Sequence, residues 1–205
     1  MGYATTVLRV VTGATMAGHG IQKLSHALGG HGPEGTAKAF EGMGFTPGRQ
    51  FAMATGIAET AGGSMMALGL GVPLACSMVT GVMAGAIGKV HYKNGFWVTD
   101  GGLEYNLHIL AATFAVAGAG GGALTLDGLR RKKHRGFGWA VAQLAVGVGA
   151  AAAALTIAER QAQAKGLSST PSSEGTQTPG HTDADGSSMV DLAGDGSMPE
   201  SAEAL

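Results

Sequence analysis

The chain has few charged, cysteine and aromatic residues. Charged residues make up 13% of its 205 positions, aromatic residues make up 5%, and Cys76 is the one cysteine. A single cysteine excludes an intramolecular disulfide and a C-x-x-C redox pair, so the chain cannot carry out dithiol chemistry alone. Charge is also unevenly distributed, because no Lys or Arg follows Lys165 and long stretches before it hold almost no charge.

Five long apolar stretches occupy the regions that lack charge. A transmembrane helix needs about 20 mostly apolar residues to cross about 30 Å of hydrocarbon. The stretches that meet this requirement are 4–23, 51–70, 72–90, 103–126 and 136–158, the last of them rich in Ala and Gly. The sequence therefore predicts an all-α integral membrane protein, a four-helix bundle with a fifth transmembrane helix. The alternative is a soluble protein in which these helices are buried.

Composition divides the chain into three regions. Residues 1–128 are predicted to form the four-helix membrane domain, and 129–165 a basic cytoplasmic loop followed by the fifth helix. Residues 166–205 are rich in Ser, Gly and acidic side chains, which predicts a disordered tail. Small residues at G-x-x-x-G spacing, Gly81 and Gly85 with Gly88 following, predict a face on which another helix packs closely.

A basic cluster between the fourth and fifth stretches predicts the topology. Cytoplasmic loops of membrane proteins carry an excess of Lys and Arg. This places the N-terminus in the cytoplasm, segments 24–50 and 92–102 outside, and the tail outside, although Arg160 and Lys165 favour the reverse for the tail. Since the cluster lies between two apolar stretches, we interpret it as a topology signal and expect no nucleic-acid partner. Its members are Arg130, Arg131, Lys132, Lys133 and Arg135.

Polar side chains within the apolar stretches are energetically unfavourable, because placing a charge at mid-bilayer costs at least ~2.5 kcal/mol of free energy. With the N-terminus inside, most of them fall in the outer half of the first four helices. Three are candidate catalytic groups, since buried carboxylates and imidazoles can exchange protons near neutral pH: Glu59, His91 and Glu104. Five are candidates for binding a cofactor or another polar ligand: His19, Lys23, Tyr105, Asn106 and His108. The alternative is a buried ion-pair network that only fixes helix register.

Metal binding is a further use for some of these side chains. His19, His91, Glu104 and His108 are possible ligands, but their spacing matches no metal signature. The Glu-x-x-His repeats of carboxylate-bridged iron sites are absent. We therefore expect no metal.

The same residues carry a resemblance to a known family. His19-Gly20 with Lys23, Glu59 before Gly62-Gly63, His91, Asn94-Gly95-Phe96, and Gly101-Gly102-x-Glu104-Tyr105-Asn106 together resemble the DoxX family of small bacterial membrane proteins, over about residues 6–128. The resemblance implies a multi-pass protein of the bacterial plasma membrane with a four-helix core and a role in redox metabolism. Relatives include subunits of thiosulfate:quinone oxidoreductase and of a terminal quinol oxidase, and members linked to oxidant defence through partner enzymes.

Three functions follow from this resemblance. The first is a subunit of a quinone-linked oxidoreductase, with quinone as its cofactor at the outer polar site and other redox subunits as partners in the lipid bilayer. The second is a non-catalytic anchor or assembly factor for redox enzymes. The third is a transporter of small solutes. Whether the chain is itself an enzyme, and whether it forms a homo-oligomer, are left open.

Overall fold

The computed structural model describes residues 2–129 and 134–166. This part of the chain is all-helical, which confirms the predicted class. Four members of the basic cluster, Arg130 to Lys133, and the predicted acidic tail from residue 167 onward lie outside the described residues. The predictions made for them therefore stay predictions.

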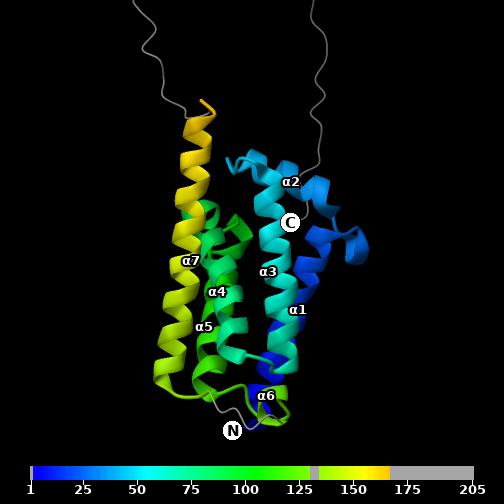
Figure 1. Cartoon of the computed structure of the whole chain (residues 1–205), viewed down its shortest axis with the longest axis vertical. Helices are drawn as coiled ribbons and strands as arrows, with labels where there is room; N and C mark the ends of the chain where they lie inside the picture. The colour runs from blue at the N-terminus through cyan, green and yellow to red at the C-terminus, as the bar shows by residue number, and fades with distance from the viewer. Residues whose placement is uncertain (1, 130–133, 167–205) are drawn as a thin grey trace, which may run out of the picture. The chain divides into compact units, whose positions relative to one another are not determined.

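Long helices run alternately up and down and form the body of the molecule (Figure 1). Short helices connect them: α2 (Gly32–Gly42) lies across one end, and α6 (Leu126–Leu129) lies at the other, near the start of α1. Two further turns, η2 (His91–Asn94) and η3 (Val98–Asp100), precede α5, and η1 (Ala27–Gly29) follows α1. The long helices are α1 (Gly2–Leu24), α3 (Gly48–Leu68), α4 (Val72–Lys89), α5 (Glu104–Ala119) and α7 (Phe137–Ala164).

Glycines bring α1 and α3 into backbone contact. A Cβ atom at Gly13 would lie 2.7 Å from the carbonyl oxygen of Gly63, and one at Gly20 would lie 2.6 Å from that of Gly56. No side chain larger than glycine fits at either distance. Close approach of this kind is what holds helices together in lipid, where apolar surface alone gives no driving force.

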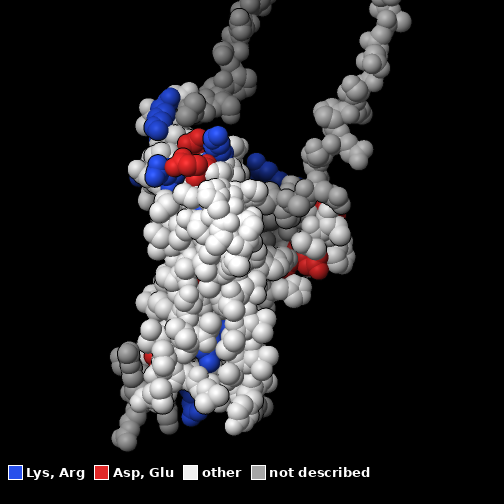
Figure 2. All heavy atoms as spheres, turned by 90° about the vertical axis from the view of Figure 1, so that its right-hand side faces the viewer, with Lys and Arg blue, Asp and Glu red and all other residues white. Residues whose placement is uncertain are grey.

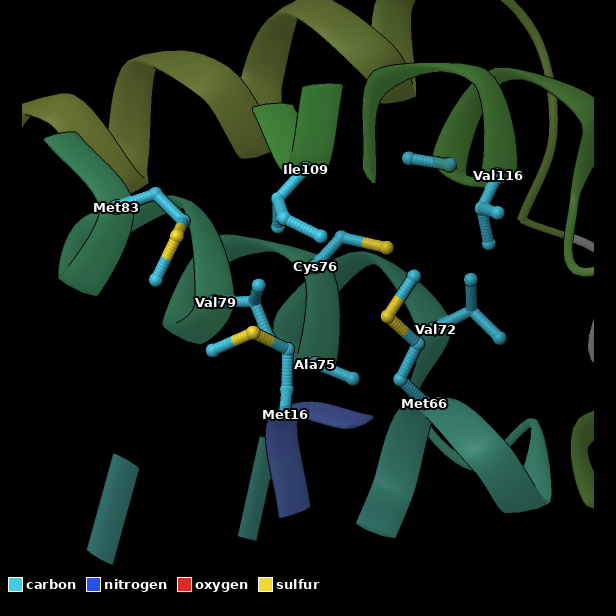
Figure 3. Packing of buried hydrophobic residues seen from close by; sticks show 10 residues of the cluster. Met16, Met66, Val72, Ala75, Cys76, Val79, Met83, Ile109 and Val116 are labelled. Atoms are coloured by element: carbon cyan, nitrogen blue, oxygen red, sulfur yellow. The ribbon is translucent and has the colours of Figure 1, made fainter. Parts of the chain in front are cut away.

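The apolar core lies where α1, α3, α4 and α5 meet (Figure 3). Met16 and Met66 reach from α1 and α3 toward α4, and Ile109 and Val116 reach toward it from α5. Cys76 belongs to this cluster and is fully buried, which is consistent with a packing role.

The helix α7 packs against α4 through small residues. A Cβ atom at Gly147 would lie 2.6 Å from Cβ of Thr80, and one at Gly81 would lie 3.3 Å from the carbonyl oxygen of Gly147. Cβ atoms at Gly85 and Gly88 would also contact α7 side chains, at 3.9 Å and 3.1 Å. The packing face predicted from these glycines is confirmed, and α7 is the helix that occupies it.

Two expectations about element boundaries were wrong. The fourth apolar stretch was expected to be helical as far as residue 126, but α5 ends at Ala119. The next three residues, Gly120, Gly121 and Gly122, all have positive φ values of 80° to 84°, which a right-handed helix cannot include. The segment 24–50, expected to be a loop, contains the eleven-residue helix α2.

Arg9 ties together the end of the bundle near the N-terminus. Its guanidinium group is 1% exposed and donates hydrogen bonds to four backbone carbonyls, at the end of α3 and in the segment after α5. In the same region the carboxylate of Asp127 accepts hydrogen bonds from the backbone N–H groups of Gly71 and Val72, at 3.0 Å and 3.1 Å, and so caps α4. Both residues satisfy backbone groups that helix ends leave unpaired.

Two helices of the described chain are long and apolar enough to cross a membrane. They are α4, with a mean hydropathy of 1.4, and α7, with a mean hydropathy of 1.9. Figure 2 shows most charged side chains near one end of the face it presents and a few toward the other, with a broad and mostly uncharged surface between them.

Candidate functional site

An ion pair joins α1 to α3 inside the bundle. Nζ of Lys23 lies 2.8 Å from Oε2 and 3.1 Å from Oε1 of Glu59, whose side chain is 3% exposed against 27% for Lys23. Lys23 lies in the last turn of α1 and Glu59 near the middle of α3. The glycine contacts between the two helices make the pair possible, because they bring the helix axes close at this level. Removing either partner would leave an uncompensated buried charge.

A second polar contact links α1 to α5 beside this ion pair. Nε2 of His19 lies 3.3 Å from the phenol oxygen of Tyr105, and the two rings meet edge to face with centroids 6.2 Å apart. We call His19, Lys23, Glu59 and Tyr105 the polar cluster.

A shallow depression of about 160 Å³ adjoins the polar cluster. Tyr105 belongs to both, and Val98, Glu104 and His108 complete the lining of the depression. One carboxylate oxygen of Glu104 accepts a hydrogen bond from the backbone N–H of Val98 at 3.0 Å, which fixes η3 against the start of α5. Nδ1 of His108 lies 2.9 Å from the backbone carbonyl oxygen of Glu104.

Two of the predicted site residues lie apart from the polar cluster. Nδ1 of His91 lies 2.7 Å from the carbonyl oxygen of Gly101, which also accepts a hydrogen bond from Asn94, so His91 joins the ends of the loop before α5. Asn106 is 3% exposed and faces α4, where its amide nitrogen lies 3.5 Å from the sulfur of Met83. Its carbonyl oxygen has no hydrogen-bond partner among the described residues.

The polar cluster has the groups needed to exchange protons with a ligand. A carboxylate, an ammonium group, an imidazole and a phenol come from three helices, and the phenol of Tyr105 lines the surface depression. Among residues 2–129 and 134–166, no group of three or more His, Cys, Asp and Glu side chains could hold a metal ion.

Sequence reasoning missed a second polar group inside the bundle. The hydroxyl of Thr80 donates a hydrogen bond to Oε1 of Gln143 at 2.9 Å and lies 3.1 Å from the hydroxyl of Thr113, and all three side chains are at most 1% exposed. These residues connect α4, α5 and α7. The available signal was Gln143, an isolated amide within an uncharged Ala- and Gly-rich stretch.

The fold is that of an all-helical protein in which two of the described helices are long and apolar enough to cross a membrane. Residues 4–92 match the sequence model of the DoxX family, which supports the predicted family membership. The match covers α1 to α4, and with them His19, Lys23, Glu59 and His91, in a little under half of the chain. A search of the curated proteins and a search of the solved structures each found no match.

The matched range is shorter than the predicted one. The resemblance was expected to extend to about residue 128, but α5, with Tyr105 and the Gly-Gly-x-Glu-Tyr-Asn segment, lies beyond residue 92. The helix α7 also lies outside the match. Half of the His19–Tyr105 contact therefore comes from a part of the chain that the family model does not cover.

Proposed function

We propose that this protein is a membrane subunit of a quinone-linked redox complex and that the polar cluster and the adjoining depression bind the quinone head group. The ion pair between Lys23 and Glu59 is the observation that carries this proposal. Charged side chains within membrane helices are costly, and such groups commonly serve ligand binding or proton transfer. Tyr105, which contacts His19, lines a depression that a ligand can reach from outside the bundle.

Each member of the cluster has a role that its position supports. The phenol of Tyr105 and the imidazole of His19 can hydrogen-bond the oxygens of a ring that enters the depression. Glu59 can hold or release a proton, and Lys23 balances its charge when the carboxylate is ionised. A quinone takes up two electrons and two protons when it becomes a quinol. The electrons would come from a partner subunit or a small reductant such as thiosulfate.

The proposal includes α1, α3 and α5 as further membrane helices beside α4 and α7. Arg9, Lys23 and Glu59 lower the apolar character of α1 and α3, but in the fold each of these charges is paired with another helix or with backbone carbonyls. Internal pairing reduces the cost of placing charge in lipid. We place the protein in the bacterial plasma membrane with its N-terminus in the cytoplasm, following the distribution of basic residues.

Purification in gentle detergent, followed by mass spectrometry for bound quinone and co-eluting proteins, tests the proposal. The unaltered protein should carry quinone, and Glu59→Gln and Tyr105→Phe should reduce the amount. Glu34→Gln and Tyr92→Phe are matched controls, because Glu34 and Tyr92 are exposed and lie outside the polar cluster. Equal quinone content in all five proteins would contradict the assigned site.

A non-catalytic anchor is the second candidate. The observation that favours it is the contact of Lys23 with both carboxylate oxygens of Glu59, which is also the geometry of a pair that only fixes helix register. Co-purification of redox enzymes without any quinone would support the anchor and would make the polar cluster a packing device.

A further inference from the structure

The helix α7 presents one face to α4 and α5 and leaves the opposite face uncovered. The buried face contains Ala140, Gln143, Gly147, Ala151 and Ala158. On the other side, residues spaced alternately four and three apart are all exposed, and a Cβ atom at Gly138 or Gly149 would meet nothing within 4 Å. We call this line of residues the seam: Gly138, Ala142, Ala145, Gly149, Ala152 and Thr156.

The seam has the period of a helix that packs along another helix. Alternating spacings of three and four residues keep one stripe facing a partner over the length of a left-handed pair. All side chains in the seam are small, so the backbones of two helices can approach closely. Such close approach favours helix association in lipid. The one hydroxyl in the seam, that of Thr156, is already bonded to the carbonyl oxygen of Ala152 at 2.8 Å and needs no partner from lipid.

Two observations at the ends of the seam indicate what covers it. At the start, a groove of about 300 Å³ is lined by Arg135, Gly138, Trp139 and Ala142. At the far end the same spacing continues to Glu159, which is exposed and followed by the exposed Arg160. Neither takes part in an ion pair within the described ranges.

We infer that the seam is the interface of a parallel dimer in which a second copy of this chain packs its own α7 against it. Two copies inserted with the same topology present α7 in the same direction, so each seam residue meets its own counterpart across a two-fold axis. In a parallel pair with this spacing, Glu159 lies beside Arg160 of the partner. The two residues therefore form two reciprocal ion pairs across the two-fold axis.

The groove fits the same arrangement. Trp139 forms its wall and is 42% exposed, and Gly138 and Ala142 leave space next to it. Two-fold symmetry lets the indole ring of each copy enter the groove of the other. This inference rests on α7 alone and is independent of quinone binding.

Disulfide crosslinking in native membranes tests the interface. In a Cys76→Ala background, Ala152→Cys lies in the seam, and Ala150→Cys lies on the same helix outside the seam, also exposed. Under oxidation, Ala152→Cys should give mostly crosslinked dimer and Ala150→Cys mostly monomer. Equal crosslinking of the two variants would overturn the inference, and so would crosslinking of Ala152→Cys to a different protein.

Charge exchange tests the pairing. Arg160→Glu places four carboxylates together at the end of the seam and should weaken dimerisation by about tenfold. Adding Glu159→Arg restores opposite charges in reversed positions and should recover most of the crosslinking of Ala152→Cys. If the single and double charge variants crosslink equally, a parallel pair with these contacts is excluded.

Discussion

At the residue scale, the function assigned to the polar cluster depends on which side chain pairs with Glu59. The sequence predicts that Glu59 lies near Lys23 and several histidines, since all of them fall in the outer halves of antiparallel helices, but it does not identify which of them pairs with Glu59. The choice depends on helix rotation, which the spacing of residues does not fix. In the fold, Lys23 forms the ion pair with Glu59. Nζ of Lys89 instead lies 5.4 Å from the centre of the Phe45 ring.

Removal of one charge from this pair should cost more than removal of both. Lys23→Met leaves the carboxylate of Glu59 buried without a counter-charge and should lower the free energy of unfolding by about 3 kcal/mol. The double variant Lys23→Met with Glu59→Gln should recover a large part of this loss. Thermal or denaturant unfolding in detergent measures the difference, and additive losses in the double variant would show that the two side chains do not depend on each other.

At the element scale, hydropathy and length identified the five long helices but not all of their ends. The starts of α1, α3, α4 and α5 were placed within three residues, because apolar character changes abruptly there. The end of α5 was missed, because Ala, Gly and Leu continue past it and hydropathy does not register a positive φ. The helix α2 was missed because it packs against α1 and α3. The sequence alone does not show this tertiary packing.

The contact between α1 and α3 depends on individual glycines, and a matched pair of alanine substitutions tests this dependence. Gly20→Ala places a methyl group against the backbone of α3 and should destabilise the protein by about 1–3 kcal/mol. Gly18→Ala, on the same helix, meets only Leu28 at 3.9 Å and should leave stability unchanged or raise it slightly. Unfolding midpoints of the two variants provide the comparison, and similar losses would contradict the close approach of the two backbones.

At the scale of the whole molecule, the orientation in the membrane follows from the helix directions. The turn after α1 and the segment between α5 and α6 lie at opposite ends of the bundle. In a Cys76→Ala background, Ser25→Cys should react with an impermeant thiol reagent added to intact cells. Leu124→Cys, where the side chain is 84% exposed, should react only after the cells are opened. The reverse pattern would invert the proposed topology, and reaction of both in intact cells would argue against a spanning bundle.

The sequence predicts only part of the candidate site. The pattern of polar residues predicted that a site lies between helices, and the fold brings four of the eight candidates into one cluster. Glu104 and His108 line the adjoining depression, whereas His91 and Asn106 take part in other contacts. These differences arise from helix rotation and from the loop before α5.

Binding of a short-chain quinone to the purified protein, measured by titration calorimetry, tests the central claim most directly. The account predicts saturable binding, with affinity at least about tenfold lower in the double variant His19→Phe with Tyr105→Phe, since both ligand hydrogen bonds are lost while the rings remain. Tyr92→Phe should bind like the unaltered protein. Absence of binding to the unaltered protein, or equal affinity in all three, would contradict the claim that the polar cluster is a quinone site.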